Sequence, residues 1–272
     1  MIVFPRAKIN IGLRILEKRP DGFHNIETYF YPVPLSDALE FVVRRDGRRS
    51  DSLRITGLMN DDDAENNLVM KAVKLMRESF SIPYLKIHLH KNIPVGAGLG
   101  GGSSDAAAML RALNRYFGFN LTSEELHTFA GRLGSDAPFF IDGTPSFAEG
   151  VGNILSEEPL DLSDYTIMLL YPGLNINTAE AYAGCVPCRS GFSLRKLINL
   201  PVNEWRGRVV NDFELNIFRT YPEIGEIKMG LYEAGAVYAS LSGSGSTVYG
   251  IFRGKTSLPD HLSKHLLTAV HL

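Results

Sequence analysis

The amino-acid sequence predicts a mixed fold of helices and strands, in which a glycine-rich loop joins a strand to a helix. Apolar and polar residues alternate over 85–90, as they do in a half-buried strand. The glycine-rich run 94–104 follows, and the alanine-rich run 105–110 then predicts a helix. Glycines let backbone N–H groups turn toward a ligand, and a helix start leaves N–H groups unpaired. This order of elements is therefore typical of a phosphate-binding site.

The same patterns predict the other elements. Strands are expected at 9–16, 26–32, 39–43, 166–171, 236–241 and 246–252. Helices are expected at 67–76, 103–116, 122–133, 193–199 and 222–234, the first of them capped by Asn66 or Asn67. Residues 157–161 are typical of a connector, which predicts a second domain from about residue 155.

Composition agrees with a soluble enzyme, which we expect to be cytoplasmic. The chain has 272 residues, of which 44% are hydrophobic, enough for a sizeable core. With 28 basic and 30 acidic residues the formal charge is −2, so no overall field recruits nucleic acid or a membrane surface. We expect neither a signal peptide nor a membrane-spanning segment, because the sequence shows the pattern of neither. The sequence leaves open whether the chain is a monomer or a homodimer.

Other glycine-rich loops fit less well. A Walker A loop would end in Gly-Lys-Ser or Gly-Lys-Thr, which is missing here. A dinucleotide fingerprint is matched formally by Gly96, Gly98 and Gly101, but no second strand with an acidic residue follows about twenty positions on. The His-Arg-Asp and Asp-Phe-Gly triplets of protein kinases are also missing. A nicotinamide-dependent dehydrogenase is thus a distant alternative.

The glycine-rich run 94–104 closely resembles the phosphate loop of the GHMP kinases. Residues 5–13 resemble the first motif of that superfamily and residues 241–247 its third, in the order that the family shows. The resemblance implies a two-domain α+β fold, with an N-terminal half like domain 2 of ribosomal protein S5 and a ferredoxin-like C-terminal half. Residues 1–154 would bind ATP and carry catalysis, and residues 155–272 would bind the substrate.

Four further segments, 8–10, 19–24, 133–140 and 211–214, are similar to the members of this superfamily that phosphorylate a cytidine-diphosphate-linked polyol. The resemblance implies ATP-dependent transfer to the 2-hydroxyl of that polyol, in the methylerythritol phosphate route to isoprenoids. The chain departs from the pattern at Phe23, where the family commonly has tyrosine. A ring for stacking remains, and the phenolic hydroxyl is lost.

Two residues are expected to carry the chemistry. By resemblance, Asp136 would accept the proton of the acceptor hydroxyl, and Lys8 would lie beside it and stabilise the negative charge. From the residues alone, Asp136 reads as a turn aspartate and Lys8 as an exposed lysine, opposite apolar neighbours in an alternating strand.

The resemblance also assigns the binding residues. ATP would be bound by Pro94, Gly96, Gly98, Leu99, Gly100, Gly101, Gly102, Ser103, Ser104, Asn67 and Lys91. The polyol substrate would be bound by Asn10, Phe23, His24 and Asp136. The third glycine motif, Gly243, Ser244 and Gly245, would approach the phosphates or the loop that holds them. Mg²⁺ is expected with ATP, and no metal ligand is assigned.

Several of these positions also have ordinary structural interpretations. Ser103 and Ser104 are good helix N-caps, and Asp105 in a first helical turn would complement the helix dipole. Phe23 could pack in a core. Cys185 and Cys188 are expected to be two reduced loop thiols, because one pair cannot supply the four ligands of a structural zinc site.

Two alternative functions remain open. One is another small-molecule kinase of the superfamily, of the homoserine or mevalonate type. The other is a catalytically silent, nucleotide-binding sensor on the same fold. Residues 21–24 favour a cytidine-bearing substrate over the first alternative, and the presence of both Lys8 and Asp136 argues against the second.

Overall fold

The computed structural model describes residues 1–58, 66–188, 193–254 and 256–272. The chain divides into two compact units, each assembled from separate stretches of sequence. The first unit contains Met1–Lys8, Pro32–Val95 and Gly100–Thr144, and the second contains Ile9–Tyr31, Gly96–Leu99 and Pro145–Leu272. The glycine loop therefore contributes residues to both units. The functional division at residue 155 stays a prediction.

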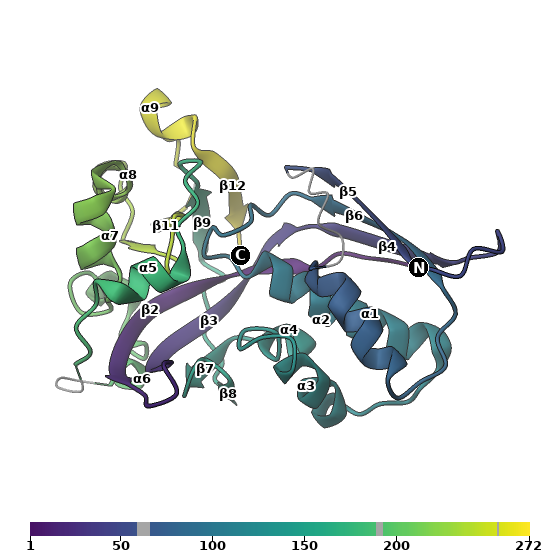
Figure 1. Cartoon of the computed structure of the whole chain (residues 1–272). Coiled ribbons are helices and arrows are strands. Elements are labelled where there is room, and N and C mark those ends of the chain that lie inside the picture. The colour runs from purple at the N-terminus through teal and green to yellow at the C-terminus, as the bar shows by residue number, and fades with distance from the viewer. Residues whose placement is uncertain (59–65, 189–192, 255) are drawn as a thin grey trace. The chain divides into compact units, whose positions relative to one another are not determined.

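In its described residues, the first unit contains a four-stranded sheet and four helices. The strand order is β1 (Ile2–Val3), β4 (Ala38–Val43), β6 (Leu85–Lys91) and β5 (Ser52–Gly57), with β5 parallel to β6 and the other pairs antiparallel. The helices are α1 (Leu68–Arg77), α2 (Gly101–Phe117), α3 (Ser123–Gly131) and α4 (Phe139–Asp142). Helices α1 and α2 lie side by side (Figure 1). Asn67 caps α1 by accepting the N–H of Val69, so this prediction is confirmed.

The second unit contains an antiparallel sheet in the order β10 (Tyr238–Leu241), β11 (Val248–Arg253), β9 (Tyr165–Leu170) and β12 (Leu266–His271). Helical segments join β9 to β10, and α9 (Asp260–Ser263) lies between β11 and β12. This is the strand order of a ferredoxin-like fold. The predicted α+β class is confirmed. The segments between β9 and β10 are α5 (Thr178–Ala183), α6 (Leu194–Leu197), η1 (Val202–Glu204), α7 (Glu214–Thr220) and α8 (Pro222–Glu233).

A third sheet has the order β2 (Arg6–Lys18), β3 (His24–Ser36), β7 (Ser146–Glu149) and β8 (Ile154–Glu157). Strand β2 is unusual because the residues between Ala7 and Leu13 are buried whichever way their side chains point. An alternating sequence predicts a half-buried strand, so the burial of both faces comes from tertiary packing that the local sequence does not encode.

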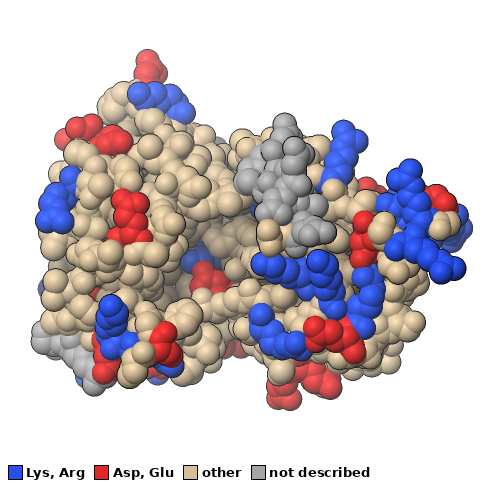
Figure 2. All heavy atoms as spheres, in the orientation of Figure 1, with Lys and Arg blue, Asp and Glu red and all other residues tan. Residues whose placement is uncertain are grey.

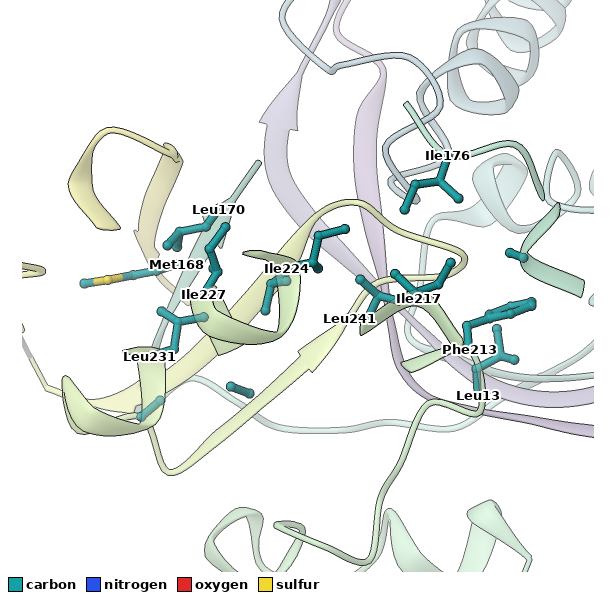
Figure 3. Packing of buried hydrophobic residues seen from close by; sticks show 14 of the residues in the cluster. Leu13, Met168, Leu170, Ile176, Phe213, Ile217, Ile224, Ile227, Leu231 and Leu241 are labelled. Carbon is teal, nitrogen blue, oxygen red and sulfur yellow. The ribbon is translucent and has the colours of Figure 1, made fainter. Parts of the chain in front are cut away.

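The core of the second unit is formed by α8 against the ferredoxin-like sheet (Figure 3). Ile224, Ile227 and Leu231 recur at helical spacing on α8 and pack with Met168 and Leu170 of β9. All five side chains are at most 4% exposed. This stripe holds the helix on the sheet and explains why α8 was predictable from sequence.

The predicted helices 67–76, 103–116, 122–133, 193–199 and 222–234 correspond to α1, α2, α3, α6 and α8. Sequence reasoning missed α4, α5, α7 and α9, which have between four and seven residues. Segments of this length show too few turns for apolar periodicity to be recognised. Their formation depends on the packing around them.

The loop between β4 and β5 carries exposed basic side chains. Arg45, Arg48 and Arg49 are exposed there, and Asp46 accepts salt bridges from Arg44 and Lys86 at 2.9 and 3.0 Å. Figure 2 shows Lys and Arg side chains gathered at the right edge of the view, where Figure 1 draws this loop. The surface is thus locally basic although the chain is nearly neutral. In the described ranges, no helix combines the length and apolar composition needed to cross a bilayer.

Replacing Leu231 by alanine should test the α8 packing. Leu231 is 0% exposed, so Leu231→Ala removes buried methyl groups and leaves a cavity. We expect the free energy of unfolding to fall by about 2 to 5 kcal/mol, measured by urea denaturation. Leu215→Ala is the matched control, because Leu215 on α7 is 87% exposed. Its effect should stay within about 0.5 kcal/mol, and equal losses for both variants would contradict the described core.

Candidate active site

Lys8 and Asp136 form an ion pair in the first unit. Lys8 Nζ lies 3.3 Å from Asp136 Oδ2, and the two side chains are 4% and 32% exposed. The sequence-based interpretation of Lys8 as an exposed lysine is wrong, because β2 is buried on both faces. A buried cation beside a more accessible carboxylate leaves Asp136 able to receive a proton from a ligand while its charge is balanced.

Packing around the ion pair fixes its place next to the start of α2. Asp136 lies in the turn before α4, and the buried rings of Phe139 and Phe140 anchor that helix. A Cβ on Gly100 would lie 2.7 Å from Phe140 Cζ and 3.1 Å from Lys8 Cε. Gly100 has φ +70° and precedes α2 directly. The lysine therefore reaches the last residue of the glycine loop, where a side chain could not be accommodated.

Helix α2 begins without a side-chain cap. Its N-cap is Gly100 and its first residue is Gly101, so Ser103 and Ser104 lie inside the first turn. The prediction that these serines could cap the helix is wrong. Ser104 Oγ donates instead to the carbonyl oxygen of Arg6 at 2.7 Å. The first-turn N–H groups thus have no capping side chain, which is the condition for binding an anion at a helix N-terminus.

Asp105 is buried rather than placed at the helix surface. It is 2% exposed, and the first turn of α2 contains no acidic residue, so the predicted complement to the helix dipole is wrong. Its Oδ2 accepts a hydrogen bond from Lys91 Nζ at 2.7 Å. The pKa of the Asp105 carboxyl is raised to about 8, mainly by burial. The positive charge of Lys91 lowers this pKa, and the negative charge of Asp37 raises it. Lys91 also donates to Asp37, and its contact with a nucleotide stays a prediction.

In the second unit, the third glycine motif holds the first part of the glycine loop. Ser242 Oγ donates to the carbonyl oxygen of Gly98 at 2.9 Å, and the N–H of Thr247 donates to the carbonyl oxygen of Ala97 at 3.2 Å. A Cβ on Gly98 would lie 1.9 Å from the carbonyl oxygen of Ser242. Only glycine permits this approach, which leaves the two backbones in direct contact.

Two neighbouring motifs support this contact. The N–H of Asn10 donates to Ser242 Oγ at 3.2 Å, and Asn10 Nδ2 donates to Thr28 Oγ1 at 2.9 Å. Asn211 Nδ2 donates to the carbonyl oxygens of Leu241 and Gly243, both at 2.8 Å. Sequence reasoning recognised 211–214 as a family pattern without a role. The structure shows that it fixes the third glycine motif.

The segment 19–24 forms the tip between β2 and β3. Arg19 and Asp21 form a salt bridge of 2.7 Å, Asp21 Oδ1 accepts the N–H of Phe23, and Gly22 has φ +88°. Phe23 is 63% exposed, so the interpretation that it packs in a core is wrong. The tip presents this ring on the surface of the second unit.

His24 follows Phe23 and stacks on Tyr182 of α5, with the ring centroids 4.5 Å apart and the planes at 9°. Tyr182 packs edge-on against Phe213. Burial, aided by the charge of Lys18, lowers the pKa of the His24 imidazole, so the ring is neutral at pH 7. Sequence reasoning missed Tyr182, because nothing in the local pattern connects 182 with 24.

The remaining predicted positions have defined surroundings. Asn67 uses its side-chain oxygen to cap α1, and Ser244 Oγ lies 3.4 Å from Thr178 Oγ1. Cys185 is partly buried and Cys188 is exposed, and both are thiols. Burial raises the pKa of the Cys185 thiol to about 11. Among the residues described by the structure, no group of three His, Cys, Asp or Glu could hold a metal ion.

Comparison with known proteins defines the class of the chain. The model of the GHMP kinases N terminal domain matches residues 67–144, and that of the GHMP kinases C terminal domain matches residues 194–262. The chain is similar to the protein named 4-diphosphocytidyl-2-C-methyl-D-erythritol kinase in Bacteroides thetaiotaomicron, with 51% identity over 96% of this chain and 95% of that protein. The class is thus that of the GHMP kinases. Within it, the chain belongs to the 4-diphosphocytidyl-2-C-methyl-D-erythritol kinase family.

Solved structures agree with this assignment. A crystal structure of 4-(cytidine 5'-diphospho)-2C-methyl-D-erythritol kinase has a TM-score of 0.78 and 31% identity, covering 97% of this chain and 93% of that one. The mevalonate kinase of Methanococcus jannaschii has a TM-score of 0.65 and 14% identity, covering 97% and 92%. The second likeness shows the fold alone.

Replacing Gly98 by alanine should disrupt the contact with the third glycine motif. The added Cβ meets a backbone carbonyl, and φ +78° disfavours any L side chain. We expect Gly98→Ala to raise the KM for ATP by about tenfold or more, measured by steady-state kinetics.

Gly131→Ala is the matched control. Gly131 lies in α3, is exposed, and a Cβ there would meet nothing within 4 Å. This variant should keep the KM for ATP and gain up to about 1 kcal/mol in unfolding free energy. An unchanged KM in Gly98→Ala would show that the close backbone approach does not shape the loop.

Proposed function

We propose that this protein transfers the γ-phosphoryl group of ATP to the 2-hydroxyl of 4-diphosphocytidyl-2-C-methyl-D-erythritol, in the methylerythritol phosphate route to isoprenoids. The observation that carries the proposal is the Lys8–Asp136 ion pair beside the uncapped start of α2. It combines an acceptor for a proton with donors for an anion. The family membership gives the substrate class.

Asp136 acts as the general base. As the substrate hydroxyl oxygen forms its bond to the γ-phosphorus, its proton passes to the Asp136 carboxylate, and the bond from the γ-phosphorus to the β,γ-bridging oxygen breaks to release ADP. Lys8, 3.3 Å away, balances the charge of the carboxylate before transfer and stabilises the oxygen that becomes negative. Neither residue has to move far, since Lys8 is held in a buried strand.

The polyphosphate is bound by backbone rather than by a Walker lysine. The N–H groups at the start of α2, from Gly101 to Ser103, are offered to an anion at the positive end of the helix dipole. Mg²⁺ is expected with ATP, where it neutralises charge between the transferred phosphoryl group and the leaving group. The described residues offer no three-residue cage, which suits an ion that arrives bound to the triphosphate and keeps few protein ligands.

The cytidine end of the substrate is recognised by the aromatic group at the β2–β3 tip. Exposed Phe23 offers a face for stacking on the base, and neutral His24, held by Tyr182, offers a nitrogen donor and a nitrogen acceptor. Asn10, bound to Thr28, contributes a side-chain oxygen.

A cytoplasmic location and a monomeric or homodimeric state stay predictions.

Activity with the proposed substrate and loss of that activity in Asp136→Ala test this function. The purified protein, with ATP and Mg²⁺, should release ADP with the cytidine polyol and not with mevalonate or homoserine. Asp136→Ala should lower kcat by about 10² to 10⁴-fold, because the proton has no acceptor. Asp164→Asn, at an exposed position, is the control and should keep full activity.

The other outcomes distinguish the alternatives. Turnover with another alcohol would assign the chain to a different small-molecule kinase. ATP binding without turnover on any acceptor would identify a silent sensor. Full activity in Asp136→Ala would show that Asp136 is not the general base.

The titration of His24 should appear in substrate binding. Because its pKa is lowered, the ring is neutral at pH 7 and gains a proton only as the pH falls below its usual range. Protonation removes the nitrogen acceptor, so the KM for the cytidine polyol should rise on acidification. His24→Gln, which cannot titrate, should have a flatter KM profile between pH 5 and pH 8. His265→Gln is the control, because burial lowers the pKa of His265 too but the ring lies outside the site. The same acid limb in His24→Gln as in wild type would contradict the assignment.

A further inference from the structure

A buried charge cluster lies beside both ends of the glycine loop, and the proposed chemistry does not use it. Lys91 ends β6, Asp37 lies between β3 and β4, and Asp105 lies in α2. Lys91 Nζ donates to Asp105 Oδ2 at 2.7 Å and to Asp37 Oδ2. The three side chains are 4%, 0% and 3% exposed. Charged groups are rarely this buried without a specific reason.

The cluster holds the chain just before the glycine loop. Asp37 Oδ1 accepts the N–H groups of Asn92 and Ile93 at 2.6 and 2.8 Å. Asn92 Nδ2 donates to the carbonyl oxygen of Ser36 at 3.0 Å. These bonds fix the two residues between Lys91 and the rest of the loop. With the ammonium of Lys91 included, the Asp37 carboxyl accepts three hydrogen bonds.

The same cluster holds the chain just after the loop. Asp105 joins Lys91 to α2, one helical turn beyond Gly101. A Cβ on Gly101 would lie 2.9 Å from Ile93 Cγ2 and 3.3 Å from Lys91 Nζ. The first turn of α2 is therefore packed directly on the lysine and on Ile93. The two ends of the loop are held together by one ammonium group.

The charges of the cluster do not balance when all three groups are ionised. Two carboxylates share one ammonium, and Asp105 Oδ1 is buried with no hydrogen-bond partner among the described residues. Asp37 and Lys91 are the charged groups that act on Asp105. A buried excess charge is costly, and a neutral Asp105 removes it. The fold should therefore tolerate an amide in place of the Asp105 carboxyl, whereas a neutral side chain in place of Lys91 would leave Asp37 without its cation.

We propose that Lys91 is a positioning residue, which sets the distance between the two ends of the glycine loop through Asp37 and Asp105 and acts on ATP only through that loop. The inference rests on the proposed role of the loop in binding ATP. It differs from direct contact of Lys91 with the nucleotide, which the family resemblance implies, because the ammonium is already bound by two carboxylates inside the first unit.

Charge-compensating variants distinguish the two roles. Lys91→Met leaves Asp37 without its cation and should raise the KM for ATP by about 10 to 100-fold through displacement of the loop. Lys91→Met/Asp37→Asn removes the uncompensated charge and should recover about tenfold of that loss. Asp105→Asn should stay within about threefold of wild type, because the amide keeps the shape of the neutral acid. Lys86→Met, exposed on the same strand, is the matched control and should leave the KM for ATP unchanged.

The measurements are the KM for ATP, the KM for the cytidine polyol, kcat, and thermal unfolding of each variant. Positioning predicts a change in the KM for ATP with an unchanged KM for the polyol, measured below every unfolding transition. Direct contact predicts that the double variant stays as defective as Lys91→Met, and this result would overturn the proposal. A lower kcat with both KM values unchanged would also overturn it, because it would show only loss of folded protein.

The dissociation constant of ATP with Mg²⁺, measured by calorimetry, separates this inference from the proposed function. If the wild-type protein turns over none of the acceptors, the proposed function fails. The positioning role can still be tested, because it predicts the same ranking of the variants by their dissociation constants for ATP. If Lys91→Met does not fold, the double variant and Asp105→Asn decide it. Loss of ATP affinity in Asp105→Asn equal to that in the double variant would contradict the charge argument.

Discussion

The shape of the glycine loop depends on one backbone contact that leaves no room for a side chain. The backbone of Gly98 lies so close to the carbonyl of Ser242 that a Cβ would be 1.9 Å from the oxygen. Ser242, Asn10 and Asn211 supply the hydrogen bonds around this contact, so the third glycine motif is itself fixed from two directions. Backbone packing therefore shapes the loop. Its glycines serve this close packing, although a glycine-rich sequence by itself would suggest a flexible segment.

Burial is the feature shared by the two lysines to which roles are proposed. Lys8 and Lys91 are long, charged side chains that water would normally surround, and both are almost completely buried beside carboxylates. In such surroundings a charge–charge interaction is stronger than at the surface, and the side chains have few alternative conformations. One lysine balances the proposed base and the other holds the loop. The two roles differ because Asp136 remains partly exposed, whereas Asp37 and Asp105 do not.

Sequence could predict what local pattern and motif encode. The alternation at 85–90 and the alanine-rich run after the glycines identified β6 and α2, and Asn67 was one of the two candidate caps of α1. The pairing of Lys8 with Asp136 was available only from the family resemblance, since the two residues lie 128 positions apart in the chain and neither has a local signal. The same limit explains Asp105. An aspartate near a helix start suggests a dipole role, and only the fold shows that Lys91 and Asp37 surround it.

Tyr182 and the segment 211–214 show the same limit from another side. Tyr182 stacks on His24, which comes much earlier in the chain, and Asn211 binds the carbonyl oxygen of Leu241, which comes much later. A sequence pattern can identify such residues as belonging to a family without stating what they touch. Their function in the fold becomes visible only with the partner atoms in place.

The two thiols differ enough to be useful to an experimenter. Cys185 is partly buried, its pKa is raised to about 11, and its Sγ lies 3.2 Å from the carbonyl oxygen of Ala181, so little thiolate is present at neutral pH. Cys188 is exposed, and its N–H is bound to the carbonyl oxygen of Ile15 at 2.9 Å, which ties it to β2. The chain contains only these two cysteines. A maleimide fluorophore would therefore attach selectively at Cys188, giving an optical reporter beside β2 without any engineered cysteine.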